Sequence, residues 1–217
     1  MNSEIYLLTP SDLLSDDKNV EQFKALYTQA LDRGRVSCVL LSGSASNPKT
    51  LKKTVEALQS VTQERDIAFL IEDDYENAKT LGCDGVHLND AGRYKEAREY
   101  LGTDYIVGVD CGISRHDAIL VGEAGADYVA FNNRRPLPEI EDPDVREFEE
   151  GGPKGLELLT WWQTMMTPPC VSMDDIPIEA VKSHADAGAD FIAVQTAIWN
   201  HRDNPATAIT EVNEAIA

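Results

Sequence analysis

The sequence of 217 residues contains no long hydrophobic run. A helix that crosses a bilayer needs about 18 to 20 consecutive apolar residues, whereas the longest apolar stretches here have about five to seven. Residues 1–12 also lack the basic start and the long apolar stretch of a secretory signal. These absences predict a protein without a membrane span or an export signal, and we expect it to be cytoplasmic.

Cysteine is scarce and is not arranged in pairs. The four residues Cys38, Cys83, Cys111 and Cys170 are scattered, and no two of them have the CxxC spacing of a redox or zinc motif. Scattered cysteines are typical of reduced thiols in a cytosolic protein. We therefore expect neither a disulfide framework nor a bound zinc ion.

Basic residues are few in comparison with acidic ones. The chain has 19 lysines and arginines against 38 aspartates and glutamates, and its net charge is −19. A surface with this charge repels the phosphate backbone of nucleic acids and anionic lipid head groups, so we expect neither nucleic acid nor a membrane as a partner. A small-molecule ligand is compatible with this charge, but a polyphosphate would need a local group of positive charges or a metal ion.

Short apolar runs alternate with amphipathic stretches along the whole chain. Strands are predicted at residues 5–9, 36–42, 67–71, 85–88, 105–110, 128–131, 170–173 and 191–194. Helices are predicted at residues 20–33, 49–65, 93–101, 114–124, 155–166, 178–187 and 205–217, with a short one that ends at 78. Eight strand–helix units close a TIM barrel, so the sequence predicts the α/β class and a single (βα)8 TIM-barrel domain over residues 1–217.

Three of these units begin with the same sequence pattern. Residues 81–87, 124–130 and 187–193 each place a glycine, a small residue and an aspartate directly before an apolar strand. Glycine is favoured at the end of a helix because it adopts a positive φ at little cost. Asp84, Asp127 and Asp190 therefore lie at the amino-terminal end of the barrel, where we expect them to stabilise the fold.

Residues 132–154 form a long segment without a helix or strand pattern. The segment contains four prolines and seven acidic residues, and it follows the sixth predicted strand. Because TIM-barrel active sites form at the carboxyl ends of the strands, a long loop here is typical of a lid or a binding loop. A solvated loop without a function is the alternative, and the sequence leaves both interpretations open.

Polar side chains are predicted at the carboxyl ends of most strands, which together form the rim of the barrel. Glu72, Asp73 and Asp74 end the third strand, where they could hold a hard divalent cation or cap the next helix. His87 ends the fourth strand, and its position favours a hydrogen-bonded core histidine over a ligand-binding one. The other rim candidates are Ser42, Ser44, Asn89, Asp90, Asp110, Asn132, Asn133, Arg134, Arg135, Asp174, Asp175, Gln195 and Thr196.

The turn after the seventh strand lacks a phosphate-binding pattern. TIM barrels often bind phosphate there through the backbone N–H groups of glycines. In this chain Asp174 and Asp175 occupy that turn. Two adjacent carboxylates repel a phosphate unless a cation lies between them, so we expect phosphate binding at this turn to require one.

Several segments together resemble the family of thiamine phosphate synthase and its relative thiazole tautomerase. FLIEDD at 69–74 and GCDGVHL at 82–88 are similar to one family stretch, and GADYVAF at 125–131 is similar to a family strand. AGADFIAVQTAI at 187–198 is similar to the family's last strand and the turn after it. The resemblance covers most of the chain in the order of its elements and implies a (βα)8 barrel.

The resemblance implies an enzyme that joins a pyrimidine methyl diphosphate to a thiazole phosphate with Mg²⁺. In the family, Mg²⁺ and basic side chains draw the diphosphate away, and the thiazole nitrogen captures the resulting pyrimidine cation. The family's magnesium aspartate falls on Asp73, so Asp73 with Glu72 or Asp90 would hold the ion. The candidates for the implied catalytic group that folds over the diphosphate are Arg134, Arg135 and Lys154. The substrate-binding residues expected at the rim are Ser42, Asp110, Asn132, Asp174, Gln195 and Thr196.

The chain departs from the family at the groups that bind phosphate. LLSGS at 40–44 replaces a family segment that supplies an arginine and a lysine, and Asp174 and Asp175 replace two glycines. Losing one contact to a departing charged group commonly costs about 3 kcal/mol. The main hypothesis is therefore a thiamine-phosphate-synthase-like barrel whose activity is weak, altered or lost. The alternatives are a non-catalytic barrel that binds a small molecule or a partner in thiamine metabolism, and a different enzyme that uses the acidic rim for a divalent metal.

Overall fold

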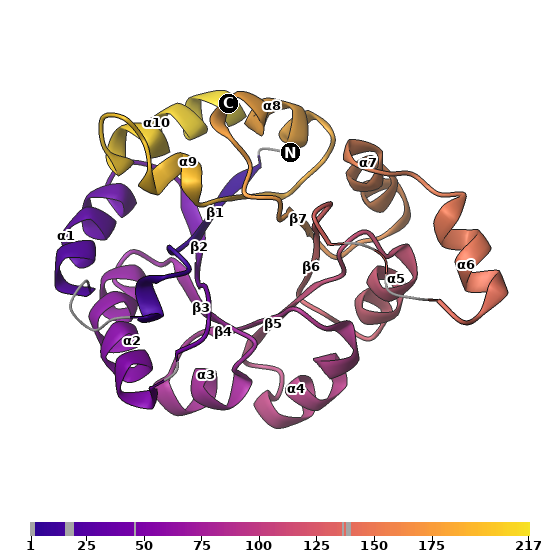
Figure 1. Ribbon diagram of the computed structural model, residues 1–217, viewed down its shortest axis with the longest axis horizontal. Coiled ribbons are helices and arrows are strands. Elements are labelled where there is room, and N and C mark those ends of the chain that lie inside the picture. Colours follow the sequence, from indigo (N-terminus) through magenta and orange to yellow (C-terminus); the bar gives the residue numbers. More distant parts are fainter. Residues whose placement is uncertain (1–2, 16–19, 46, 136, 138–139) are drawn as a thin grey trace.

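The computed structural model describes residues 3–15, 20–45, 47–135, 137 and 140–217. Eight parallel strands follow one another around a closed barrel in the order of the chain, and β8 pairs with β1 (Figure 1). The strands are β1 (Glu4–Leu8), β2 (Val36–Leu41), β3 (Ala68–Glu72), β4 (Gly85–Leu88), β5 (Ile106–Asp110), β6 (Tyr128–Phe131), β7 (Cys170–Ser172) and β8 (Phe191–Val194). The predicted TIM barrel is confirmed.

Helices surround the ring of strands in Figure 1. They are α1 (Val20–Leu31), α2 (Pro48–Gln63), α3 (Tyr75–Leu81), α4 (Tyr94–Leu101), α5 (Arg115–Glu123), α6 (Pro143–Glu150), α7 (Leu156–Met165), α8 (Ile178–Asp186), α9 (Thr196–Trp199) and α10 (Pro205–Ile216). Two 3₁₀ turns, η1 (Leu13–Ser15) and η2 (Ala91–Arg93), precede α1 and α4. Within the described ranges, no helix has both the length and the apolar character that crossing a bilayer requires.

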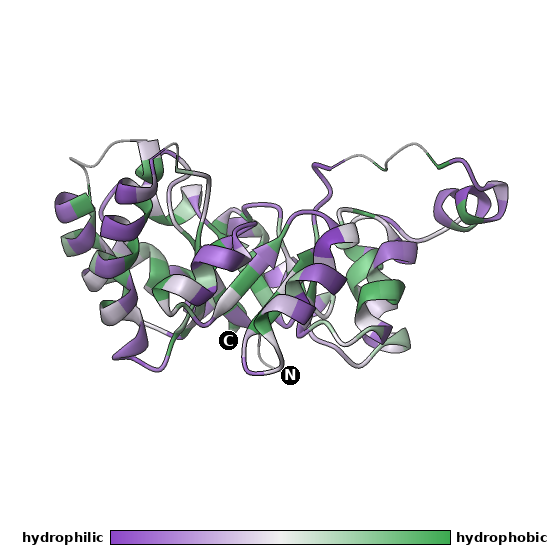
Figure 2. Ribbon diagram, turned by 90° about the horizontal axis from the view of Figure 1, so that it is seen from below, coloured by the Kyte–Doolittle hydropathy of each residue, from purple (hydrophilic) through white to green (hydrophobic). Residues whose placement is uncertain are grey.

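Side chains alternate along each strand between two hydrophobic cores. In β1, Ile5 and Leu7 belong to the core between strands and helices, whereas Tyr6 belongs to the core inside the barrel. Trp162 of α7 is fully buried in the outer core, and its indole N–H donates to the Pro168 carbonyl at 2.7 Å. Hydrophobic residues, green in Figure 2, lie in the central strands and on parts of the surrounding helices. This alternation directs every second side chain at a strand end towards the barrel axis.

The three aspartates of the repeated pattern have the structural role that the sequence predicts. Each accepts the backbone N–H of a residue at the start of the preceding strand. These bonds are Phe69 to Asp84, Val107 to Asp127 and Cys170 to Asp190, each of 2.8 Å. The carboxylates therefore connect neighbouring parallel strands at the amino-terminal end of the barrel.

The prediction of a segment 132–154 without regular structure is wrong in its second half, because residues 143–150 form α6. Asp142 caps this helix by accepting the N–H of Asp144 at 2.9 Å, and Pro143 fits its first turn. The dense acidic residues hid the helical pattern. Figure 1 shows α6 outside the ring of helices, beyond α5 and α7.

One buried carboxylate fastens α6 to the barrel. The Glu149 side chain is 1% exposed and accepts hydrogen bonds from Ser114 Oγ at 3.1 Å and from the backbone N–H groups of Arg115 and His116 at 3.1 and 2.6 Å. The Arg115 guanidinium, 8% exposed, lies 3.8 Å from the same carboxylate and 3.7 Å from the centre of the Phe148 ring. Because a carboxylate is stabilised by the free N–H groups and the dipole of a helix start, Glu149 holds α6 against α5.

Candidate active site at the carboxyl ends of the strands

Three hydrogen-bonded rings lie in the barrel interior. Tyr128 OH is 2.7 Å from Tyr6 OH and 2.9 Å from His87 Nδ1. A Cβ at Gly108 would lie 1.8 Å from the Tyr128 ring, so glycine makes room for this ring. His87 is 1% exposed, which confirms the prediction of a hydrogen-bonded core histidine. Sequence reasoning found no partner for it, because Tyr128 lies 41 residues away on another strand.

The buried imidazole makes stability depend on pH. Burial lowers the pKa of His87 from its ordinary value, and the carboxylates of Asp110, Glu72 and Asp73 oppose this shift in part. The unfolded chain therefore binds this proton at a higher pH than the folded chain does. The resulting stability is present above about pH 6.5 and is lost as the pH falls below it.

Urea unfolding between about pH 7 and about pH 5 measures this effect. The unfolding free energy of the unmodified protein is expected to fall more steeply than that of His87→Gln, by up to about 1.4 kcal/mol per pH unit. Both proteins contain the same carboxylates. The contribution of these carboxylates to the pH dependence of unfolding therefore cancels when one slope is subtracted from the other. Equal slopes would show that His87 does not titrate differently in the two states.

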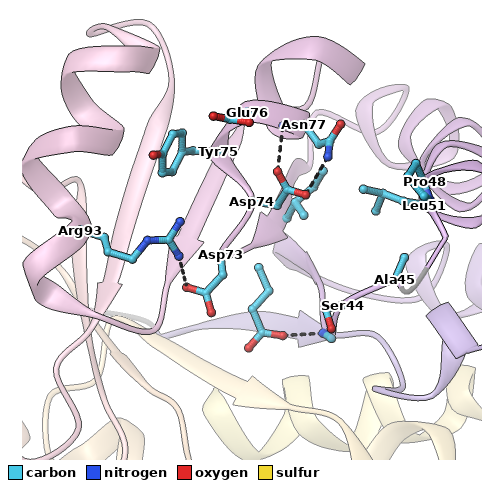
Figure 3. Close-up of a pocket in the computed structure, with 13 residues that line it drawn as sticks. Ser44, Ala45, Pro48, Leu51, Asp73, Asp74, Tyr75, Glu76, Asn77 and Arg93 are labelled. Carbon is cyan, nitrogen blue, oxygen red and sulfur yellow. Dashed lines mark hydrogen bonds and ion pairs between the residues drawn. The ribbon is translucent and has the colours of Figure 1, made fainter.

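The three acids at the end of β3 have different partners. Asp74 caps α3, because its carboxylate accepts the backbone N–H of Asn77 at 3.0 Å and the side-chain amide of Asn77 at 2.8 Å (Figure 3). Glu72 and Asp73 instead meet at the side-chain amide of Asn89, which lies 2.8 Å from Glu72 Oε1 and 2.7 Å from Asp73 Oδ2. Of the two interpretations of this cluster, helix capping is therefore right for Asp74.

A cavity of about 590 Å³ opens between the start of α2 and the loop from β3 to α3 (Figure 3). Glu72, Asp73 and Arg93 are among its lining residues. Arg93 Nη1 lies 3.5 Å from Asp73 Oδ1, and the guanidinium lies 5.4 Å from the centre of the Tyr75 ring. The Arg93 side chain is 38% exposed, so it keeps donors free for a ligand. Arg93 was not among the residues predicted for the site. The only feature of the sequence that pointed to it was its position shortly after the fourth strand.

The donor set at this cavity suits Mg²⁺. Magnesium prefers oxygen ligands and is commonly held by one or two carboxylates together with water and phosphate oxygens. Glu72 and Asp73 supply two such carboxylates side by side. Asp90 accepts the backbone N–H of Gly92 at 2.8 Å and so closes its own turn. Within the part of the chain that the structure describes, no three side chains of histidine, cysteine, aspartate or glutamate are grouped as for a metal ion.

Asp110, Asn132 and Arg135 come together at the ends of β5 and β6, next to Asn89 and Asp90. The buried Asp110 carboxylate accepts the backbone N–H of Gly112 at 2.7 Å and the side-chain amide of Asn132 at 3.3 Å, and it lies 3.2 Å from Arg135 Nη1. Asp110 thereby fixes the first part of segment 132–154 over the end of β5. The structure thus joins three of the predicted site residues.

Arg134 and Lys154 are exposed and are held less firmly. The backbone N–H of Arg134 donates to Asn132 Oδ1 at 3.1 Å. This hydrogen bond closes a tight turn over residues 132–134. Lys154 stands two residues before α7, and its carbonyl accepts the N–H of Glu157 at 3.2 Å. Arg134 and Lys154 thus belong to separate segments, because α6 lies between them in the chain.

The turn after β7 shows how the two aspartates replace a phosphate cradle. Asp175 Oδ1 accepts the backbone N–H groups of Gln195 at 2.8 Å and Thr196 at 2.9 Å, and Asp175 has a φ of +52°. Asp174 Oδ2 accepts the amide of Asn133 at 2.6 Å. The Asp175 carboxylate therefore occupies backbone donors at the start of α9. This intramolecular contact was not predicted from the sequence.

Ser42 joins a chain of contacts across β1, β2 and β8. Its backbone N–H donates to Thr9 Oγ1 at 3.0 Å, and Gln195 Nε2 donates to the Thr9 carbonyl at 2.6 Å. The Ser42 hydroxyl is buried and has no hydrogen-bond partner among the described residues. Ser42 and Gln195, far apart in the sequence, thus belong to one region of the rim, and Thr9 is a further member that sequence reasoning missed.

The chain is similar to known proteins over most of its length. The family model described as thiamine monophosphate synthase matches residues 5–198. The thiamine-phosphate synthase of Rhodospirillum centenum is 38% identical over 213 residues, which are 98% of this chain and 97% of that protein. That of Erythrobacter litoralis is 35% identical over 201 residues, 91% of this chain and 89% of that protein. In fold, the chain is similar to the thiamine phosphate pyrophosphorylase of Pyrococcus furiosus, with a TM-score of 0.76 at 21% identity over 98% of this chain and 95% of that one.

Proposed function

Because the chain belongs to the thiamine monophosphate synthase family, we propose that it joins a pyrimidine methyl diphosphate to a thiazole phosphate and releases diphosphate. The similarity to proteins named thiamine-phosphate synthase over nearly the full length supports this function. The observation that carries it in the structure is the pair of carboxylates Glu72 and Asp73 at a cavity that Arg93 also lines. In the reaction, the bond from the pyrimidine methylene carbon to the diphosphate oxygen breaks, and the thiazole nitrogen forms a bond to that carbon.

Glu72 and Asp73 are the proposed Mg²⁺ ligands, and Asp90 would join them by turning away from the Gly92 N–H. Bound Mg²⁺ supplies charge that offsets the negative charge on the departing diphosphate. The acidic lining makes such an ion necessary, because Glu72 and Asp73 would otherwise repel the diphosphate. The proposed metal requirement thus follows from the same carboxylates that make the cavity unsuitable for a bare anion.

The proposed contacts of the chain with the diphosphate come from two sides of the rim. Arg93 lies at the cavity with an exposed guanidinium and takes the place of the basic residues that the end of β2 lacks. Segment 132–154 supplies the others, which are Arg134, Arg135 and Lys154. The residues proposed to bind the rest of the substrates are Ser42, Asp110, Asn132, Asp174, Gln195 and Thr196. We also propose that the protein works in the cytoplasm, because its four cysteines are free thiols.

The purified protein is expected to form thiamine phosphate and inorganic diphosphate in equal amounts from the two substrates in excess Mg²⁺. Equal amounts follow because one bond forms for each bond that breaks. Chromatography of thiamine phosphate and an enzyme-coupled diphosphate assay measure the two products, and EDTA should abolish both. A folded protein that forms neither product would contradict the synthase function and favour a non-catalytic binding barrel. Undiminished product in EDTA would contradict the metal requirement.

A further inference from the structure

Asn89 contacts both carboxylates of the proposed metal site. Its backbone N–H donates to Asp73 Oδ1 at 2.8 Å. Its side-chain Nδ2 donates to Asp73 Oδ2 at 2.7 Å and to Glu72 Oε1 at 2.8 Å. Both oxygens of Asp73 and one oxygen of Glu72 are thus held by a single residue. The remaining oxygen of Glu72 accepts the backbone N–H of Gly43.

Two features of the site oppose this arrangement of carboxylates. Glu72 and Asp73 are like charges brought within reach of one amide nitrogen, and such charges repel one another. Asp73 also has a φ of +56°, in the left-handed region that residues other than glycine adopt uncommonly, although aspartate tolerates it better than most. Its backbone N–H donates to the His87 carbonyl at 2.8 Å, so the end of β4 holds both its backbone and its side chain. Interactions from β4 therefore maintain a conformation that β3 alone does not favour.

We propose that Asn89 is a positioning residue that keeps the carboxylates of Glu72 and Asp73 together for a divalent cation. The inference rests on the proposed function for the identity of the ion as Mg²⁺. An asparagine suits this role because its NH₂ group has two hydrogens for two acceptors, whereas aspartate would add a third negative charge and leucine would donate nothing. Residues that orient metal ligands in this way commonly contribute about 10- to 100-fold to metal affinity.

Asn77, which lines the cavity together with Glu72 and Asp73, provides a matched control. Its side-chain amide donates to Asp74 Oδ2 at 2.8 Å, a bond of the same kind to the neighbouring carboxylate. Asp74 caps α3 and makes no contact with Asn89 among the described hydrogen bonds. Asn77→Ala therefore removes one amide–carboxylate bond of this lining without touching Glu72 or Asp73.

Titration of the full chain with Mn²⁺, followed by electron paramagnetic resonance and competed with Mg²⁺, measures the affinity without substrates. Asn89→Ala is expected to weaken the binding of both ions by about 10- to 100-fold, and Asn77→Ala by less than about twofold. Unchanged affinity in Asn89→Ala, or no binding by the unmodified protein, would overturn the proposal. If Asn89→Ala fails to fold, Asn89→Leu keeps the side-chain volume and is tested in its place. If neither variant folds, the side-chain amide resonance of Asn89 in the unmodified protein must shift when Mg²⁺ is added, and an unshifted resonance would overturn the proposal.

The experiment separates this inference from the proposed function. Metal binding that depends on Asn89 in a protein that forms no thiamine phosphate would leave the positioning role in place and remove the synthase function. If instead an Asn89→Ala protein with unchanged metal affinity formed thiamine phosphate, the synthase function would stand and the positioning role of Asn89 would be removed.

Discussion

Asp73→Asn is expected to lower the rate of thiamine phosphate formation by at least about a hundredfold, the largest effect on activity that we predict. The substitution keeps the shape of the side chain and removes its charge, so a divalent cation loses one of its carboxylate ligands. Asparagine also tolerates the positive φ of residue 73, which is +56°. The folded structure should therefore survive, and the loss should appear in turnover at saturating substrate and excess Mg²⁺.

Asp74→Asn is the control for Asp73→Asn, because it neutralises the next carboxylate in the same loop. Asp74 accepts two hydrogen bonds from Asn77 at the start of α3, so its charge serves the helix. We expect Asp74→Asn to cost at most about 1 kcal/mol of stability and to change the rate by less than about threefold. A rate for Asp73→Asn within about tenfold of the unmodified protein would contradict the assignment of Asp73 as a metal ligand.

Glu149→Ala is expected to lower the free energy of unfolding by about 3 to 5 kcal/mol, the largest effect on stability that we predict. The Glu149 side chain is 1% exposed and accepts three hydrogen bonds at the start of α5. Its removal leaves those donors without their partner and the Arg115 guanidinium, 8% exposed, without a counter-charge. Urea unfolding measures the loss, and limited proteolysis should cut the chain near α6 faster because that helix is no longer fastened to α5.

Two further variants test the cause of the Glu149 effect. Glu150→Ala removes the neighbouring acid of α6, which is exposed, and should change stability by less than about 0.5 kcal/mol. Arg115→Met combined with Glu149→Leu replaces the buried pair by apolar groups and should recover much of the loss, because no unpaired buried charge remains. A loss below about 1 kcal/mol in Glu149→Ala would show that water reaches Arg115 and that α6 docks through other contacts.

The fold could be predicted from the sequence because its signals are local and repeated. Each strand is a short apolar run, and the aspartates at 84, 127 and 190 come directly before strands whose neighbours they connect. By contrast, α6 escaped prediction because the contact that stabilises it joins Glu149 to a helix 34 residues earlier in the chain.

The candidate site could be predicted only as a set of residues at strand ends. Asp110, Asn132 and Arg135 do meet, as expected of residues that follow adjacent strands. The roles of Asn89 and Asp175 could not be predicted, because they depend on loop conformations with positive φ at Asp73 and Asp175. A positive φ cannot be predicted from the presence of an aspartate, because most aspartates have a negative φ. The sequence therefore identifies the acids, and the loops decide which of them face a ligand.

The Asp175 carboxylate acts as a tethered partner for two backbone donors. It accepts the N–H groups of Gln195 and Thr196 from a loop of the same chain. A tethered group has a high effective concentration that dilution cannot lower. The folded chain therefore satisfies these two donors itself, and this carboxylate links the loop after β7 to the start of α9.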